Sequence, residues 1–227
     1  MADWFDALPA DRLIAEFSLW SADLVRLADD LARIAPHADI LHVDVADGHF
    51  APALLYFPDL VAAVKKVSKV PVHIHLMCAD AILRSQIEQF AEAGADLISV
   101  HVENANAVEM IDLIRTKGLR AGAVLKVSTP VSEAEKLVDG IDMLTLLGTA
   151  IGVKGQGLDP AACDRLGAAR AMVAGAGRRV IVAADGGIRE HTVPELRRGG
   201  AETVVLGSLA FGAADLGARM DWLRKLG

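Results

Sequence analysis

The sequence predicts an α/β fold, a TIM (β/α)₈ barrel, and three observations support this prediction. Short β-branched apolar runs alternate with longer segments of helical period along all 227 residues. Hydrophobic residues make up 53% of the chain and aromatic residues only 4%, which is typical of helices that cover a parallel sheet. The eight strand–helix units match the barrel, which typically takes about 250 residues.

Eight apolar runs are predicted as strands, at residues 13–19, 38–45, 71–77, 96–102, 120–126, 141–147, 179–184 and 202–206. Helices are predicted at residues 22–35, 58–67, 80–93, 106–117, 131–138, 160–175, 190–199 and 212–225. In the first helix Leu24, Leu27 and Leu31 recur every three or four residues, with polar residues between them. Ser21 and Ser132 stand at the start of two helices and are predicted N-caps.

The whole chain, residues 1–227, is predicted to form one barrel domain, because long linkers and low-complexity segments are absent. A doubly wound open sheet is the alternative fold. It rarely uses eight such regular units, and no Gly-x-Gly-x-x-Gly follows the first strand. Residues 1–10 are expected to form a short helix or an arm across the bottom of the barrel.

Charge and cysteine content narrow the class of partner and the compartment. A net charge of −7 and a pI near 5.5 argue against nucleic acid as a partner. No apolar run approaches the roughly 20 residues that span a bilayer, and the N-terminus lacks the pattern of a secretory signal. Cys78 and Cys163 have no spacing typical of a disulfide framework. The sequence therefore predicts a cytoplasmic protein with reduced thiols and no membrane partner.

Two histidines and two aspartates lie at the ends of predicted strands, where the mouth of a barrel carries its active residues. They are His42, Asp44, His75 and Asp185, and are called the His₂Asp₂ cluster below. Side chains two apart on a strand share a face, so His42 and Asp44 point into the mouth together. Two imidazoles and two carboxylates suit one divalent ion such as Zn²⁺, Mn²⁺, Fe²⁺ or Co²⁺. The paired carboxylates also suit two-sided proton transfer, which points to a metal-dependent enzyme.

Other histidines share these strands. His73 lies on the same face as His75, but His75 is nearer the strand end and is the preferred ligand. His73 and His101 are interpreted as packing groups or as groups that orient the ligands.

Glycine loops follow the last two strands, where barrels often hold phosphate. Gly186 and Gly187 follow Asp185, and Gly207 and Ser208 follow the last strand. Glycines let backbone N–H groups approach an anion closely. A simple tight turn is the alternative reading of Asp-Gly-Gly, and the second Gly-Ser loop favours phosphate.

The chain resembles the ribulose-phosphate 3-epimerases over nearly its whole length. The matching segments are Ser18-Leu-Trp-Ser-Ala-Asp23, His42-Val-Asp-Val-Ala-Asp-Gly-His-Phe50, His75-Leu-Met77, Val100-His-Val-Glu103, Asp185-Gly-Gly187 and Gly207-Ser208 followed by Phe211-Gly212. The resemblance implies a barrel of the ribulose-phosphate-binding type and a metal held by the His₂Asp₂ cluster. It also implies a homo-oligomer, a dimer or a hexamer.

The resemblance further implies a reaction. One aspartate, Asp44 or Asp185, would remove the C3 proton of a 2-keto sugar phosphate to give an enediolate, and the other would return a proton to the opposite face. D-Ribulose 5-phosphate would become D-xylulose 5-phosphate. Ser18 resembles the contact to a substrate hydroxyl, although an ordinary strand-end hydroxyl is the alternative.

The loop after the sixth strand departs from the family. The family usually has Asn-Pro-Gly-Phe-Gly-Gly-Gln, whereas this chain has Ala150-Ile-Gly-Val-Lys-Gly-Gln156. Gly152, Gly155 and Gln156 remain, and Lys154 replaces a glycine. We expect Lys154 to contact phosphate, with a solvated loop charge as the alternative.

Further departures surround the pocket at Ala46, Lys126 and Leu147. They suggest altered walls, so another ketose phosphate, such as a ketotetrose or ketohexose phosphate, is an alternative substrate. Lys126 also raises the possibility of a Schiff-base aldolase, which has no use for a His₂Asp₂ cluster. A non-catalytic sugar-phosphate sensor is the remaining alternative, and a sensor needs no pair of proton-transfer groups.

Overall fold

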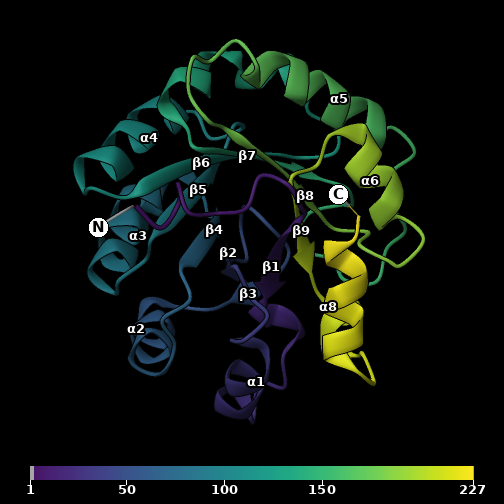
Figure 1. Cartoon of the computed structure of the whole chain (residues 1–227). Helices are drawn as coiled ribbons and strands as arrows, with labels where there is room; N and C mark the ends of the chain where they lie inside the picture. Colours follow the sequence, from purple (N-terminus) through teal and green to yellow (C-terminus); the bar gives the residue numbers. More distant parts are fainter. Residues whose placement is uncertain (1–2, 227) are drawn as a thin grey trace.

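The structure is a computed structural model that describes residues 3–226, and its eight parallel strands close into a barrel (Figure 1). The barrel strands are β1 (Ile14–Ser18), β2 (Ile40–Asp47), β4 (Val72–Met77), β5 (Leu97–His101), β6 (Arg120–Leu125), β7 (Met143–Leu147), β8 (Ile181–Asp185) and β9 (Thr203–Leu206). Strand β1 pairs in parallel with both β2 and β9, which closes the sheet. The predicted TIM barrel is confirmed, and each predicted strand overlaps an observed one.

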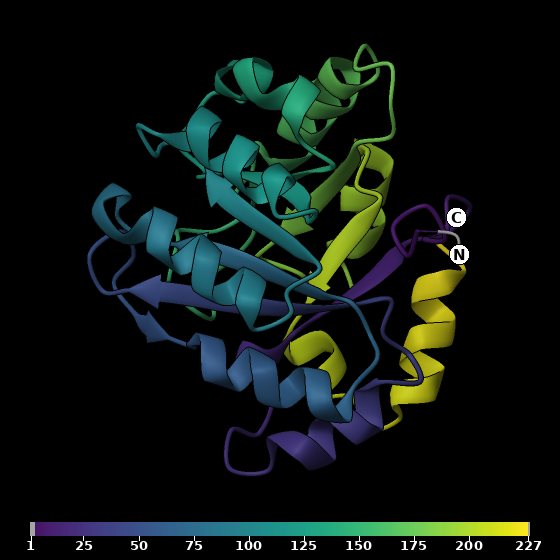
Figure 2. The same ribbon diagram turned by 90° about the vertical axis from the view of Figure 1, so that its left-hand side faces the viewer.

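Helices follow the strands and surround the barrel (Figure 2). The α-helices are α1 (Leu27–Ile34), α2 (Pro58–Val67), α3 (Asp80–Glu92), α4 (Ala107–Thr116), α5 (Ala162–Val173), α6 (Val193–Gly199), α7 (Ser208–Phe211) and α8 (Leu216–Arg224). Two 3₁₀ helices, η1 (Leu19–Ser21) and η2 (Val131–Gly140), complete the set. Because helices cover the outside and side chains fill the inside, the strands are buried on both faces.

The first helix is shorter than the sequence predicts. It begins at Leu27 after Arg26, and Ser21 lies in η1, so the prediction of Ser21 as its N-cap is wrong. The Asp23 carboxylate accepts the Val25 N–H at 3.0 Å, a local turn that competes with helix. Leu24, the first residue of the apolar spacing that predicted this helix, is 58% exposed and does not belong to its buried face.

Two other helices and one strand also differ from the predictions. Residues 131–140 form a 3₁₀ helix that begins after Pro130, which places Ser132 inside the first turn instead of at the N-cap. The predicted last helix, 212–225, begins instead at Leu216, where Asp215 accepts the Ala218 N–H at 2.9 Å and caps α8. A short strand, β3 (Leu54–Leu55), pairs antiparallel with β2 and was not predicted.

The N-terminal residues close the bottom of the barrel as an arm without regular helix; residues 1 and 2 lie outside the described part. Phe5 is 1% exposed and packs in a cluster with Ile14, Ile40, Leu97, Met143 and Ile181, which belong to the barrel strands. The Arg179 guanidinium donates hydrogen bonds to the carbonyls of Leu8 and Pro9 and fixes the arm.

Within residues 3–226, no helix has both the length and the apolar character needed to cross a bilayer. Cys78 and Cys163 are both free thiols, in agreement with the absence of a disulfide framework.

Candidate active site at the barrel mouth

The His₂Asp₂ cluster comes together at the carboxyl ends of three strands. His42 and Asp44 lie on β2, His75 on β4 and Asp185 at the end of β8. Asp44 Oδ1 lies 3.2 Å from both His42 Nε2 and His75 Nδ1. Asp185 Oδ2 lies 4.0 Å from His42 Nε2 and 3.8 Å from His75 Nδ1. The four ligand atoms all lie within 4.8 Å of one another.

These separations fit the donor set of one divalent ion. Four ligand atoms placed about 2.0 Å from a tetrahedral centre lie about 3.3 Å apart, close to the observed 3.2–4.0 Å. The group of buried histidine and aspartate side chains can therefore hold a metal ion.

The second ring nitrogen of His42 has its own partner, which supports the same conclusion. His42 Nδ1 lies 2.6 Å from Oε1 of Glu16, a fully buried carboxylate on β1. A ring that donates its Nδ1–H to Glu16 turns the lone pair of Nε2 toward the carboxylate oxygens of the cluster. A metal ion between those lone pairs, or a second proton on His42, makes that arrangement favourable.

His75 is oriented in the same sense through a longer chain of hydrogen bonds. Its Nε2 lies 2.9 Å from His101 Nε2, and His101 Nδ1 lies 2.9 Å from Glu103 Oε2. Burial lowers the pKa of His101 to about 4, so this ring is neutral and can donate to Glu103 while accepting from His75. The Nδ1 lone pair of His75 is then left facing Asp44. The interpretation of His101 as an orienting group agrees with these contacts.

The electrostatics of the site favour positive charge at its centre. Burial opposes the charged form of His42, but the Asp44 and Glu16 carboxylates outweigh it and raise the pKa of His42 well above its ordinary value. Burial likewise opposes the Glu16 carboxylate, yet His73 and His42 lower the pKa of Glu16.

The two aspartates are driven in opposite directions. Burial raises the pKa of Asp185 to about 6, and the Asp44 carboxylate reinforces this against the attraction of His42. For Asp44, burial is overcome by the charge and hydrogen bonds of His42 and His75, which lower its pKa well below its ordinary value. Two neighbouring carboxyl groups with separated protonation preferences are typical of an acid–base pair.

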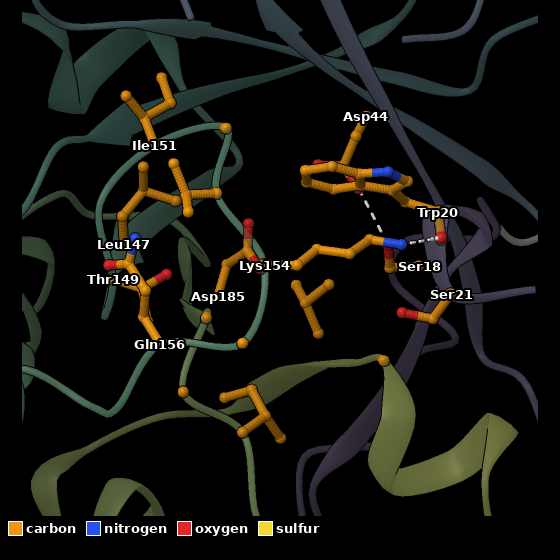
Figure 3. Close-up of a pocket in the computed structure, with 18 of the residues that line it drawn as sticks. Ser18, Trp20, Ser21, Asp44, Leu147, Thr149, Ile151, Lys154, Gln156 and Asp185 are labelled. Atoms are coloured by element: carbon orange, nitrogen blue, oxygen red, sulfur yellow. Dashed lines mark hydrogen bonds between the residues drawn. The ribbon is translucent and has the colours of Figure 1, made fainter. Parts of the chain in front are cut away.

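A cavity of about 340 Å³ opens above the cluster (Figure 3). Asp44, His75 and Asp185 line it, whereas His42 lies beneath them and is fully buried. The other predicted residues that line it are Ser18, Leu147, Gly152, Lys154, Gly155, Gln156, Gly186, Gly187, Gly207 and Ser208. Ala46 and Lys126 are outside this lining; the Lys126 ammonium lies 3.7 Å from the centroid of the Phe50 ring.

Two glycine loops on the β8 and β9 side of the cavity need glycine for geometric reasons. Gly186 and Gly187 have φ values of 88° and 71°, which side chains rarely adopt. A Cβ at Gly187 would lie 2.8 Å from Leu158 Cα, and one at Gly207 would lie 2.8 Å from Ser21 Oγ. Both loops line this side of the cavity, with Ser208 at the start of the short helix α7.

Lys154 extends across the cavity toward the β1 side (Figure 3). Its ammonium donates a hydrogen bond to the Trp20 carbonyl and lies 4.6 Å from the centroid of the Trp20 ring. Burial lowers the pKa of Lys154, and the Asp44 carboxylate opposes that effect. Gln156 accepts the Ala150 N–H at 3.1 Å and braces the loop. Ser18 Oγ donates to Asp44 Oδ2 at 2.8 Å.

The sequence reasoning missed several residues of the site. Trp20, Ser21 and Arg189 line the cavity, and Arg189 is a cation two residues after the Gly186-Gly187 pair. Glu16 was missed as well. It could have been found from its place two residues before Ser18, on the inward face of a strand that is otherwise apolar up to Ser18.

Fold and site together define a class: a (β/α)₈-barrel enzyme with a candidate divalent-metal centre at the carboxyl ends of its strands. The model of the ribulose-phosphate 3-epimerase family matches residues 14–211, and the chain belongs to this family. Epimerases are isomerases, so the chain is an enzyme of the isomerase class.

Curated relatives match over most of their length. Ribulose-phosphate 3-epimerase 2 of Cupriavidus necator is 38% identical over 206 residues, which cover 87% of this chain and 84% of the relative. Ribulose-phosphate 3-epimerase of Bacillus subtilis is 33% identical, covering 87% of this chain and 92% of the relative. A crystal structure of 3-hexulose-6-phosphate synthase matches with a TM-score of 0.67 at 18% identity, covering 94% of this chain and 99% of that one. This structural likeness shows the shared fold.

Proposed function

We propose that this chain is a metal-dependent epimerase that inverts C3 of a ketose phosphate, with D-ribulose 5-phosphate converted to D-xylulose 5-phosphate as the first reaction to test. The observation that carries the proposal is the convergence of Asp44 and Asp185 with two histidines on the floor of the cavity. The names of the curated relatives support the choice of substrate.

The His₂Asp₂ cluster would hold the ion, which by its donor set is Zn²⁺, Mn²⁺, Fe²⁺ or Co²⁺. When bound, the ion supplies positive charge beside the oxygens on which negative charge develops.

The two aspartates carry the protons. One carboxylate removes the C3 proton, and the electron pair of the C–H bond moves toward the C2 carbonyl to give an enediolate. The other carboxyl group, already protonated, gives its proton to the opposite face of C3 as the C2 carbonyl reforms. The opposed pKa shifts make Asp44 the carboxyl group that more readily stays ionised and Asp185 the one that more readily takes up a proton. Ser18 donates to Asp44 and fixes the direction of its carboxylate.

The phosphate group is proposed to bind between the glycine loops. One side of the cavity is lined by Gly186, Gly187, Gly207 and Ser208, whose backbone N–H groups would bind the anion. The loop of Gly152, Gly155 and Gln156 lies on the other side and carries Lys154, which brings a cation into the same cavity.

Exchange of the C3 proton tests the proposal directly. The purified protein is loaded with Zn²⁺, Mn²⁺, Fe²⁺ or Co²⁺ and incubated with D-ribulose 5-phosphate in D₂O, and proton NMR follows loss of the C3 signal. We expect deuterium at C3 and formation of D-xylulose 5-phosphate. Absence of exchange with every metal and every ketose phosphate tried would refute the epimerase and favour a sensor.

A panel of ketotetrose, ketopentose and ketohexose phosphates addresses the substrate. Leu147 and the loop of Lys154 line the cavity, so the residues that differ from the family at these positions affect which length of ketose phosphate fits. Lys126 lies outside the lining and against Phe50, which speaks against its use as a Schiff-base lysine in this cavity. A homodimer or homohexamer stays a prediction, which light scattering of the purified protein tests.

A further inference from the structure

A fully buried carboxylate lies beneath the His₂Asp₂ cluster and has no place in the proton-transfer scheme. Glu16 is on β1, points into the barrel, and is 0% exposed. Burial of an ion costs several kcal/mol unless partners compensate it. A buried glutamate in an otherwise apolar strand segment therefore calls for a reason.

Both of its close partners are imidazoles, and both bind the same oxygen. Glu16 Oε1 lies 2.6 Å from His42 Nδ1 and 2.5 Å from His73 Nδ1. His73 in turn places its Nε2 2.6 Å from Ser99 Oγ. Among the described residues, Glu16 Oε2 has no hydrogen-bond partner, so the contacts of this side chain are concentrated on the two rings.

The group of Glu16, His42 and His73 is not a second metal site. Ligand atoms about 2.1 Å from one ion lie about 2.9 Å or more apart in tetrahedral or octahedral geometry. The separations of 2.5 and 2.6 Å are shorter and match hydrogen bonds in which a charged acceptor takes part.

We propose that Glu16 is a positioning residue for the metal centre: it holds the proton of His42 on Nδ1 and thereby keeps Nε2 as the metal-binding lone pair. This inference rests on the proposed metal site of the epimerase. His73 and Ser99 complete this arrangement, because His73 binds the same Glu16 oxygen as His42 and Ser99 binds the other ring nitrogen of His73. Carboxylates that bind the outer nitrogen of a metal-ligating histidine fix its tautomer and strengthen its binding.

The other ligand histidine offers an internal comparison. The outer nitrogen of His75, Nε2, reaches a carboxylate only through His101, and that carboxylate, Glu103, has a side chain that is 20% exposed. Glu16 touches its ligand histidine directly and is fully buried. Loss of the Glu16 charge is therefore expected to weaken metal binding more than loss of the Glu103 charge.

The test measures binding of Zn²⁺ alone, by competition with a chromogenic chelator, in the purified full-length protein. Glu16→Gln keeps the size of the side chain and removes its charge. We expect Zn²⁺ affinity to fall by about 10–100-fold in Glu16→Gln, by less in Glu103→Gln, and to recover in part in Glu16→Asp.

Asp142→Asn is the matched control: Asp142 is 2% exposed and is bound by Arg120 and Arg178. It precedes β7, at the opposite end of the barrel, so its loss destabilises the fold without weakening Zn²⁺ binding.

A second measurement separates positioning from stability. In ¹⁵N NMR of the histidine rings of the metal-free protein, at a pH at which His42 is neutral, its proton is expected on Nδ1 in the wild type and on no fixed nitrogen in Glu16→Gln. Unchanged Zn²⁺ affinity and an unchanged His42 tautomer in Glu16→Gln would overturn the proposal, as would an equal loss of affinity in Asp142→Asn. If Glu16→Gln does not fold, Glu16→Asp carries both measurements. A wild type that binds no divalent ion would refute the proposed metal site, while the tautomer still decides the role of Glu16.

Discussion

Removal of the Lys154 ammonium tests the proposed phosphate contact, because the ammonium already has a contact with the Trp20 ring that a phosphate would have to replace. Without substrate, Lys154 donates to the Trp20 carbonyl and lies 4.6 Å from the centroid of the Trp20 ring. A phosphate in the cavity would compete with Trp20 for the same ammonium. The effect of Lys154→Ala on substrate binding is therefore the free energy of the phosphate contact minus that of the Trp20 contact which the phosphate displaces.

The magnitude follows from the contacts on each side. A hydrogen bond between charged partners contributes about 1.5–3 kcal/mol, which the phosphate would supply. The contact with the Trp20 ring, worth about 0.5–1 kcal/mol at an accessible site, is given up, whereas the hydrogen bond to the Trp20 carbonyl can be kept because the ammonium has three N–H donors. The net gain of about 1–2 kcal/mol corresponds to a rise in KM of about 5–30-fold in Lys154→Ala. Because the ammonium is remote from C3 in this scheme, kcat is expected to stay near its wild-type value.

Steady-state kinetics with D-ribulose 5-phosphate, on protein with a full complement of metal, measure both constants. Lys126→Ala is the control, since its ammonium lies against Phe50 outside the cavity lining. The KM of this control is expected to match the wild type. An unchanged KM in Lys154→Ala would refute phosphate contact. A fall in kcat at constant KM would place the lysine at the reacting carbons instead.

Four further substitutions have defined outcomes. Asp44→Asn and Asp185→Asn should each lower kcat for epimerisation by about 10²–10⁴, measured by a coupled assay, because each removes one of the two proton carriers. Asp47→Asn should lower the free energy of unfolding at pH 7 by about 1–2 kcal/mol, since its amide nitrogen would face the Ala79 N–H that Asp47 now accepts at 2.7 Å. Backbone hydrogen bonds outweigh partial burial and lower the pKa of Asp47 below its ordinary 3.8, so urea titrations should show this difference above about pH 4 and its loss as acid protonates the wild-type carboxyl group. Phe5→Ala should cost about 3 kcal/mol in urea unfolding at unchanged KM, because Phe5 is 1% exposed and closes the end of the barrel away from the site.

The barrel could be predicted because its strands and helices leave separate periodic signals. Each strand is a short apolar run that is buried on both faces, and the chain carries eight such runs. The predicted helix starts are wrong where local side-chain contacts determine the first residue of a helix. Asp23 folds residues 22–26 into turns ahead of α1, and Asp215 starts α8 at Leu216. Neither contact changes the apolar spacing from which the helices were predicted.

The candidate site was predictable where strand geometry fixes direction. His42 and Asp44 share a face of β2, and register sets Asp44 directly beside His75 on β4. The contacts of Lys154 with Trp20 were not predictable, because the 150–157 loop has no period that fixes where its side chains point. Glu16 was missed because its contact with His42 depends on the pairing of β1 with β2. This pairing sets Ser18 beside His42, and Glu16 lies two residues earlier on the same face of β1.

The polar interior beneath the ligands explains how a hydrophobic barrel can hold a fixed metal site. Hydrogen bonds link Glu16 to both His42 and His73, and His73 to Ser99 on the next strand. Gly122 on β6 makes room for this layer, since a Cβ there would lie 2.0 Å from Ser99 Oγ. Bulky apolar side chains usually fill barrel layers and would leave the His42 ring free to choose either tautomer. A layer of hydrogen-bonded side chains is costlier to bury, but it ties the direction of the ligand to three strands of the wall at once.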